Sequence, residues 1–179
     1  KILEGGAAKA AEAGFPVLGG HTVRSDEPMY GMAVTGFVQP GKQVTNAAAR
    51  VGDKLVLTKK LGTGIIATAG KAQVGQPDHL AAAVKSMSTL NKDAADAMVA
   101  VGAHSATDVT GFGLVGHLMS MTRASRVNAR VWRSTLPVLD GTIDLIEAGM
   151  VPGGTHRILQ SLENGVVWDE ALTDSDKYL

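Results

Sequence analysis

The segment from Ala106 to His117 constrains the fold of this chain more than any other. Asp108 is followed by Gly111 and Gly113, and an apolar pattern with helical spacing begins at Leu114. Glycine tolerates positive φ and lets another group approach the backbone closely, so this order predicts a short strand, a tight turn and an exposed helix N-terminus. Such a corner can hold an anion, a metal ion or both. A corner without a ligand would leave Asp108 unexplained, because aspartate is rare in strands.

The glycines of this segment also match the dinucleotide fingerprint G-x-G-x-x-G, at Gly111, Gly113 and Gly116. The fingerprint requires an acidic residue about 20 positions further on, at the end of the next strand, to hold a ribose hydroxyl. The next expected strand, 127–132, is followed by Arg133 instead. An arginine there could accept a 2′-phosphate, so NADP binding stays open as an alternative.

Apolar periodicity and glycine corners predict an α/β fold, with a mixed sheet covered by helices. A helix is expected over residues 1–13, and strands are expected at 17–18, 30–38, 54–59, 127–132 and 165–168. The helices that cover the sheet are expected at 62–74, 78–101, 114–124 and 138–150, the second of them divided around Ser88 to Asn91. A further near-match to the fingerprint, from Gly62 to Ala67, is followed by a helix, so close packing of helix on sheet explains it better than a dinucleotide.

Charge and composition exclude several classes of function. Seventeen basic and seventeen acidic residues cancel, which gives no electrostatic reason to expect a nucleic-acid or membrane-surface partner. The sequence has no cysteine, so disulfides and thiolate metal sites are excluded within it. No apolar run approaches the ~18 residues of a membrane span, and no secretory signal precedes the globular pattern. We therefore expect a cytoplasmic protein with no membrane association.

As a string, residues 106–117 resemble a signature of the selenophosphate synthetases (selenide, water dikinases). These enzymes belong to an ATP-binding superfamily that includes aminoimidazole ribonucleotide synthetase. Thr110-Gly111-Phe112-Gly113 favours this branch over its sister enzymes. The resemblance covers about residues 18–155, and further landmarks of the family occur there in the same order: Gly19-Gly20-His21-Thr22, Ala33-Val34-Thr35-Gly36, Thr45-Asn46-Ala47, Leu61-Gly62-Thr63-Gly64 and Val151-Pro152-Gly153-Gly154-Thr155.

The resemblance implies a domain organisation and a reaction. Residues 1–42 would be the end of an N-terminal ATP-binding α/β domain, and residues 43–179 an incomplete C-terminal α/β domain of the aminoimidazole ribonucleotide synthetase-like fold. The whole enzyme would be a homodimeric phosphotransferase that needs Mg²⁺. It would convert selenide, ATP and water to selenophosphate, AMP and phosphate.

The resemblance also implies roles for particular residues. Asp108 would be a magnesium ligand, since Mg²⁺ prefers hard oxygen ligands. The ATP-contacting residues would be Gly19, Gly20, His21 and Thr22. The family's catalytic cysteine or selenocysteine and its lysine would precede Lys1, so we expect no catalytic residue here. We expect the chain to be a fragment without the N-terminal part and the extreme C-terminus, and to be inactive alone.

Two alternatives to the dikinase stay open. One is a sister enzyme of the same superfamily, acting for instance on a ribonucleotide or on thiamine phosphate. The other is a noncatalytic nucleotide-binding or dimerisation module. His117 is expected to be a structural or surface group more often than a ligand, and no function is assigned to His156 and Arg157, which could approach a phosphate.

Overall fold

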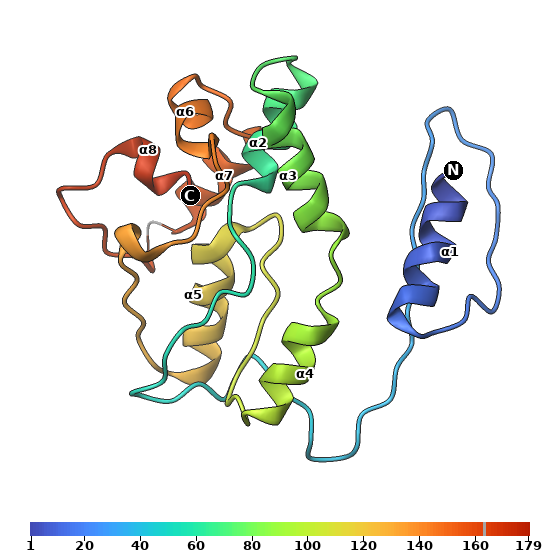
Figure 1. Cartoon of the computed structure of the whole chain (residues 1–179). Coiled ribbons are helices and arrows are strands. Elements are labelled where there is room, and N and C mark those ends of the chain that lie inside the picture. The colour runs from blue at the N-terminus through green and yellow to red at the C-terminus, as the bar shows by residue number, and fades with distance from the viewer. Residues whose placement is uncertain (163) are drawn as a thin grey trace.

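The computed structural model of the chain, which describes residues 1–162 and 164–179, consists of helices joined by long irregular connections (Figure 1). Each segment that the sequence predicts to be helical contains a helix, and the segment 78–101 contains two. In chain order the helices are α1 (Ile2–Ala13), α2 (Thr63–Lys71), α3 (Pro77–Ser88), α4 (Lys92–Ala100), α5 (Gly113–Ser125), the 3-10 helix η1 (Arg133–Thr135), α6 (Thr142–Glu147), α7 (Gly153–Leu162) and α8 (Asp174–Lys177).

The mixed sheet predicted from the sequence is wrong for this structure. Across the described residues, β pairing is limited to one isolated parallel bridge between Leu61 and Val138. At this bridge the Leu61 N–H donates to Pro137 O (2.9 Å) and the Leu139 N–H donates to Leu61 O (2.9 Å). A strand forms only when it pairs with a neighbouring strand. An apolar run in the sequence does not show whether such a neighbour is present, so it does not by itself predict a sheet. The segments predicted as strands, at 17–18, 30–38, 54–59, 127–132 and 165–168, run as irregular chain.

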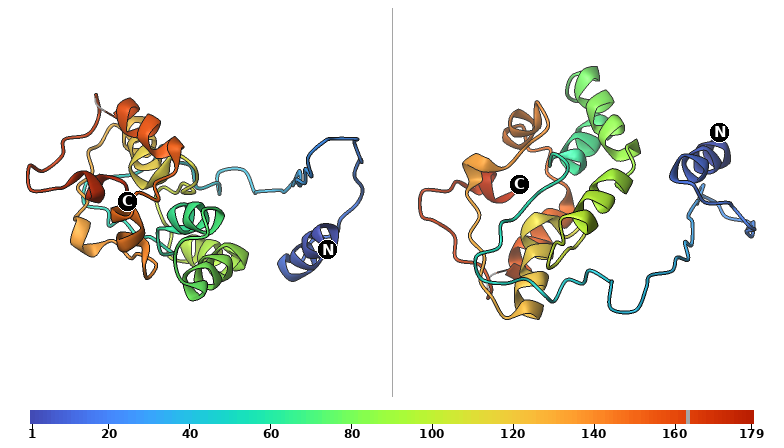
Figure 2. Two further views of the ribbon diagram at one scale, coloured as in Figure 1. Left: turned by 90° about the horizontal axis from the view of Figure 1, so that it is seen from above. Right: turned by 60° about the horizontal axis from the view of Figure 1, so that its bottom comes forward.

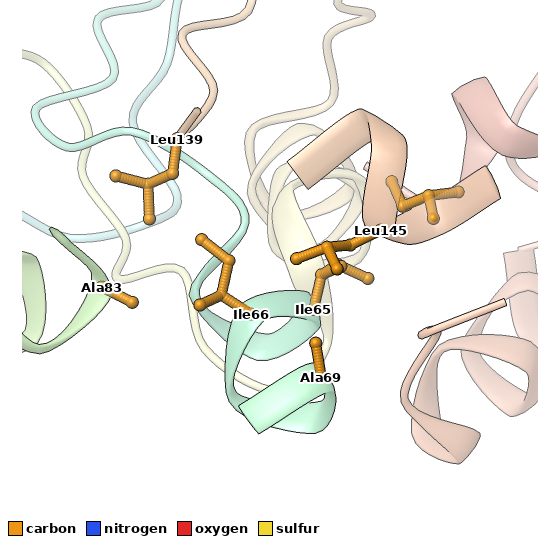
Figure 3. Close-up of a cluster of buried hydrophobic side chains, with 7 residues drawn as sticks. Ile65, Ile66, Ala69, Ala83, Leu139 and Leu145 are labelled. Carbon is orange, nitrogen blue, oxygen red and sulfur yellow. The ribbon is translucent and has the colours of Figure 1, made fainter. Parts of the chain in front are cut away.

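The hydrophobic core lies where α2 meets α3, α6 and the segment just before α6 (Figure 3). Ile65, Ile66 and Ala69 fall on one side of α2, at the spacing that puts residues on a common helix face. Burial of a side chain such as Ile66, which is 2% exposed, contributes about 1.5–3 kcal/mol. The other core residues are Ala83, Leu139, Leu145 and Ile146.

Residues 1–44, here called the N-terminal arm, contrast with the core. Figures 1 and 2 show α1 and the irregular chain that follows it lying apart from the helices around the core. Every residue from 16 to 43 is exposed, including Phe37. Within the arm, Tyr30 packs back against α1. Its hydroxyl lies so close to Gly6 that a side chain at position 6 would collide with it.

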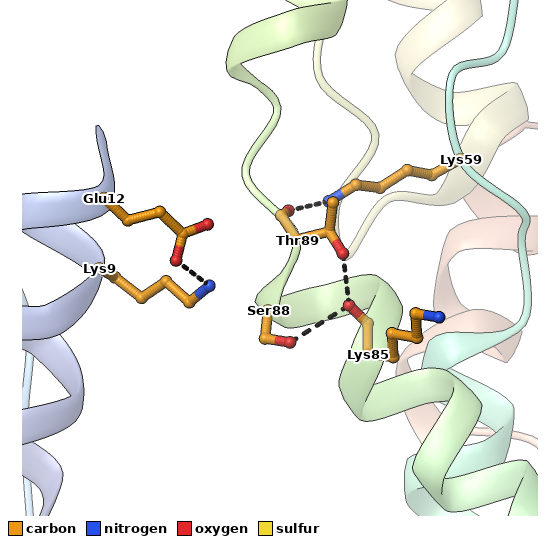
Figure 4. Close-up of polar contacts among 6 residues, drawn as sticks. All are labelled: Lys9, Glu12, Lys59, Lys85, Ser88 and Thr89. Atoms are coloured by element: carbon orange, nitrogen blue, oxygen red, sulfur yellow. Dashed lines mark hydrogen bonds and ion pairs between the residues drawn. The ribbon is translucent and has the colours of Figure 1, made fainter. Parts of the chain in front are cut away.

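The C-terminal end of α1 faces the α3–α4 junction across a groove of about 260 Å³ (Figure 4). Lys9 Nζ donates to Glu12 Oε2 (2.6 Å) on the α1 side. On the other side, Lys59 Nζ donates to Thr89 O (2.5 Å) and holds the chain before α2 against the end of α3. No helix in the described part of the chain combines the length and the apolarity needed to cross a bilayer.

Candidate functional site

The turn around Asp108 leads directly into α5. Gly113, the first residue of α5, has φ +66°, and its N–H donates to Thr110 O (2.9 Å). No side chain caps the start of the helix. The expected order of turn and helix is therefore present, although the segment before the turn is irregular chain rather than a strand.

His117 fastens this turn to the helix. Its Nε2 accepts a hydrogen bond from the Thr110 N–H (3.2 Å) and lies 3.0 Å from Thr110 Oγ1. The Phe112 ring meets the imidazole edge-on, with 5.8 Å between ring centroids. Because Nε2 accepts from a backbone N–H, a neutral His117 carries its proton on Nδ1. The residue thus has a structural task, as the sequence argument expected.

Asp108 stands on the exposed side of the turn. Thr107 Oγ1 donates to the Asp108 backbone carbonyl (3.2 Å), and the described residues give its carboxylate neither a hydrogen bond nor an ion pair. Nor do the described residues contain a cluster of three or more Asp, Glu or His side chains able to hold a metal ion. Asp108 is therefore available to a cation as a single carboxylate.

A polar brace, which the sequence argument missed, supports the chain that enters the turn. Thr45 O accepts hydrogen bonds from the Ala106 N–H (3.0 Å) and the Ser105 hydroxyl (2.8 Å). Ser125, the last residue of α5, accepts from the Ala49 N–H (3.1 Å) and donates to Asn46 O (3.4 Å). The only signal in the sequence was the resemblance of Thr45-Asn46-Ala47 to a family landmark.

A second contact holds the same two segments together. The Arg50 N–H donates to Asp53 Oδ2 (2.8 Å), and His104 Nδ1 lies 2.9 Å from Asp53 Oδ1. These hydrogen bonds, the one from Arg50 first, hold the pKa of the Asp53 carboxyl below its ordinary value. The brace and this contact fix the path of residues 45–53 beside residues 104–106.

The other predicted site residues lie in the N-terminal arm. Gly19, Gly20, His21 and Thr22 are all exposed and belong to an irregular segment. Figures 1 and 2 agree in showing that part of the arm apart from α5. The structure therefore does not bring this segment and the Asp108 turn together.

The glycines, the expected strand and the arginine that favoured dinucleotide binding have other roles in the structure. Gly116 lies inside α5 with the Phe112 side chain close by, and residues 127–132 do not form the strand that a dinucleotide-binding unit requires. Arg133 Nε forms an ion pair with Asp176 at 3.1 Å, so this guanidinium is already neutralised by a carboxylate. The fingerprint is therefore a coincidence of glycine spacing.

His156 and Arg157 lie on α7. The His156 ring packs edge-on against Tyr178, with 5.1 Å between centroids, and Arg157 is exposed. This contact fastens Tyr178 to α7.

Comparison with known proteins finds matches to two family models. The model described as AIR synthase related protein, C-terminal domain, matches residues 50–166, and the one described as AIR synthase related protein, N-terminal domain, matches residues 1–38.

Several curated proteins called selenide, water dikinase are similar to this chain. The protein from Citrifermentans bemidjiense is 48% identical over 165 residues, which cover 92% of this chain and 48% of that protein. The protein from Geobacter sp. (strain M21) is 46% identical with the same coverage. The protein from Caldanaerobacter subterraneus subsp. tengcongensis is 41% identical, over 93% of this chain and 48% of its own length. The chain thus spans about half the length of the curated relatives that it matches.

Proposed function

The chain belongs to the AIR synthase related protein family, and from this membership we propose that it is part of an ATP-dependent phosphotransferase that makes selenophosphate. The observation that carries the proposal is 48% identity, over 92% of the chain, to a protein called selenide, water dikinase. The substrates would be ATP and selenide, and the products selenophosphate, AMP and phosphate. We propose residues 1–42 as the end of the N-terminal domain and residues 43–179 as part of the C-terminal domain of a cytoplasmic homodimer.

Asp108 is proposed as a magnesium ligand. Mg²⁺ usually keeps several waters and binds through one or two carboxylates together with substrate phosphates, so a single exposed carboxylate without a protein partner fits this donor set. When bound, Mg²⁺ would neutralise the charge that develops on the phosphates. The contribution of the chain is to hold the carboxylate in place, through the Thr110–His117 hydrogen bonds and the brace at Thr45.

The segment Gly19-Gly20-His21-Thr22 is proposed to contact ATP. Two glycines leave the backbone open to close approach by a phosphate, and backbone N–H groups are effective phosphate donors. Because this segment is exposed, its backbone is accessible to a phosphate. In the proposal, the arm and the Asp108 turn approach the same nucleotide only in the complete enzyme.

The test is selenide-dependent formation of AMP from ATP. We expect activity from a longer protein of the relatives' length, and none from the 179-residue chain, because the chain has no cysteine, and the family resemblance assigns the handling of selenide to a cysteine or selenocysteine. Activity of the purified chain above a no-protein control would contradict the assignment of the chemistry to residues outside it. A longer protein that hydrolyses ATP regardless of selenide would contradict the proposed substrate.

A further inference from the structure

The contact between Thr110 and His117 has two parts, which differ in what they require of the imidazole. The Thr110 N–H is only a donor and lies 3.2 Å from His117 Nε2, so Nε2 must present a lone pair to it. The Thr110 hydroxyl, whose Oγ1 lies 3.0 Å from the same nitrogen, can donate or accept. The backbone hydrogen bond therefore requires a neutral imidazole, whereas the hydroxyl can pair with the imidazole in either charge state.

Protonation of His117 exchanges one of these partners for the other. Both ring nitrogens of an imidazolium carry a hydrogen, so Nε2 can no longer accept. The Nε2–H then donates to Thr110 Oγ1, and the Thr110 N–H faces a donor and loses its acceptor. Histidine is the side chain whose ordinary charge change falls between about pH 5 and 8, so a small change of pH is enough to cause the exchange.

The Thr110 backbone restrains the Asp108 turn from two sides. Its N–H bonds to His117, and its carbonyl accepts from the Gly113 N–H (2.9 Å). No side chain caps the start of α5, and across the described residues only the backbone carbonyl of Asp108, not its carboxylate, accepts a hydrogen bond. The position of that carboxylate therefore depends on the backbone of the turn. The exchange at His117 removes one of the two hydrogen bonds that restrain this backbone.

In the described part of the chain, the hydrogen bonds of the His117 ring go to Thr110 and to no charged side chain. Its other neighbour is Phe112, an uncharged ring that meets it edge-on. On α7, which packs against α5, His156 lies against the Tyr178 ring and Arg157 is exposed. The other charged or titratable groups on α5 and its C-cap and in the segments 45–53 and 104–112 are Arg123, Arg126, Arg50, Asp53, His104 and Asp108. Thr110 is therefore the polar partner that responds when His117 gains a proton.

We propose that His117 is a positioning residue that holds the Asp108 turn in its neutral form and releases it when protonated, so that a divalent cation binds Asp108 more weakly in mild acid. The contact with Thr110 is a property of this chain alone. Its effect on a cation rests on the proposed function, because that function makes Asp108 a magnesium ligand. The two parts are therefore tested by separate measurements.

The first measurement follows the full ¹⁵N-labelled chain by NMR from about pH 8 to about pH 5. The Thr110 amide signal should move in one step, with the midpoint at which the His117 ring nitrogens titrate. His117→Gln is the decisive variant, because its side-chain carbonyl can reach the place of Nε2 and accepts a hydrogen bond throughout this range. The Thr110 step should disappear in this variant. His156→Gln, the matched change on α7, should leave the step unchanged.

The second measurement uses Mn²⁺ as the probe, because it takes carboxylate ligands as Mg²⁺ does and broadens the NMR signals of nearby amides. The Asp108 and Val109 signals of the wild-type chain should broaden, with an affinity about three- to tenfold lower at about pH 5.5 than at about pH 7.5, the equivalent of one hydrogen bond. His117→Gln should lose this difference, and Asp108→Asn should lose the broadening. In the full-length parent, the Mg²⁺ concentration for half-maximal selenide-dependent AMP formation should rise in acid, and should rise less in His117→Gln.

Several results would overturn the inference. A Thr110 signal without a step would do so, and so would an equal step in His117→Gln. Ring ¹⁵N shifts that place the proton of neutral His117 on Nε2 would also overturn it, and this result needs no variant to fold. A Thr110 step with equal Mn²⁺ affinity at both pH values would show that His117 does not position Asp108. Absence of Mn²⁺ broadening at both pH values would instead contradict the magnesium assignment, while the first measurement still decides the contact with Thr110.

Discussion

The α2–α3–α6 core and the N-terminal arm are built from similar amino acids and differ in what surrounds them. Ile66 is 2% exposed, whereas Val34 in the arm is 67% exposed. Apolar spacing is present in both regions, but only the helices of the core have neighbours on which to bury it. An apolar pattern therefore forms packed structure only where another segment of the chain covers its apolar side chains.

The largest expected effect is on stability and separates the two regions most directly. Ile66→Ala should lower the free energy of unfolding by about 2–5 kcal/mol, through lost burial and the cavity left behind. Val34→Ala, the matched truncation in the arm, should change it by less than about 0.5 kcal/mol. Urea denaturation followed by circular dichroism measures both. Equal losses in the two variants would show that the arm is packed in solution.

A second prediction concerns the Asp108 turn, which the proposed function brings together with the arm in one active site. In the full-length parent, Asp108→Asn keeps the turn and removes a charge from the metal site, so selenide-dependent AMP formation should fall at least ~100-fold. The free energy of unfolding should hold or rise, because the carboxylate lacks a protein partner. Asp26→Asn, an exposed change in the arm, is the control. Near-normal turnover with unaltered Mg²⁺ dependence in Asp108→Asn would rule out the ligand assignment.

A third prediction compares glycines. Gly62→Ala should destabilise the chain by more than about 1 kcal/mol, because it combines positive φ with a collision against Thr142. Gly36→Ala in the arm meets no atom within 4 Å and should be close to neutral. Thermal unfolding of both variants is the measurement. A neutral Gly62→Ala would mean that Gly62 is packed more loosely against Thr142 than the structure shows.

The smallest expected effect concerns pH. Since the pKa of Asp53 is lowered in the folded protein, its ionised form adds stability above the unfolded-state pKa, near the ordinary value of 3.8. That contribution is lost as the pH falls through the lower, folded-state pKa. Asp53→Asn should therefore flatten the decline of stability on the acid side, measured by urea denaturation at a series of pH values. An unchanged pH profile would argue against the contact with Arg50 and His104.

Features that depend on neighbouring residues could be predicted from the sequence, whereas features that depend on distant segments could not. The helices α1 to α6 were predictable because spacing within one segment defines an amphipathic face, whereas α7 and α8 were not predicted. The Asp108 turn was predictable because glycine determines backbone geometry locally. The mixed sheet was predicted wrongly, because strand pairing depends on segments distant in sequence, which a local apolar run does not specify. The bond between His117 and Thr110 spans only seven positions and still required coordinates, since many side chains can reach a turn.

For the candidate site, residue types were easier to predict than their arrangement. A carboxylate beside two glycines identified the Asp108 turn, but the brace from Thr45 joins it to a segment some sixty positions earlier. Nothing in the local pattern of either segment reveals that contact. The packing of Gly62 against Thr142 was equally hidden, since Gly62 looks like an ordinary packing glycine until Thr142 is placed against it.

The bridge between Leu61 and Val138 has a consequence for the order of folding. It joins residues separated by α2, α3, α4, α5 and η1, so closing that loop costs chain entropy that local helix formation does not. The intervening helices can form early, whereas the bridge and the α2–α6 contact must wait for closure. If closure follows the transition state, substitutions at Leu61 will accelerate unfolding and leave the folding rate nearly unchanged. The lifetime of the folded chain would then depend in part on the two hydrogen bonds that close this loop.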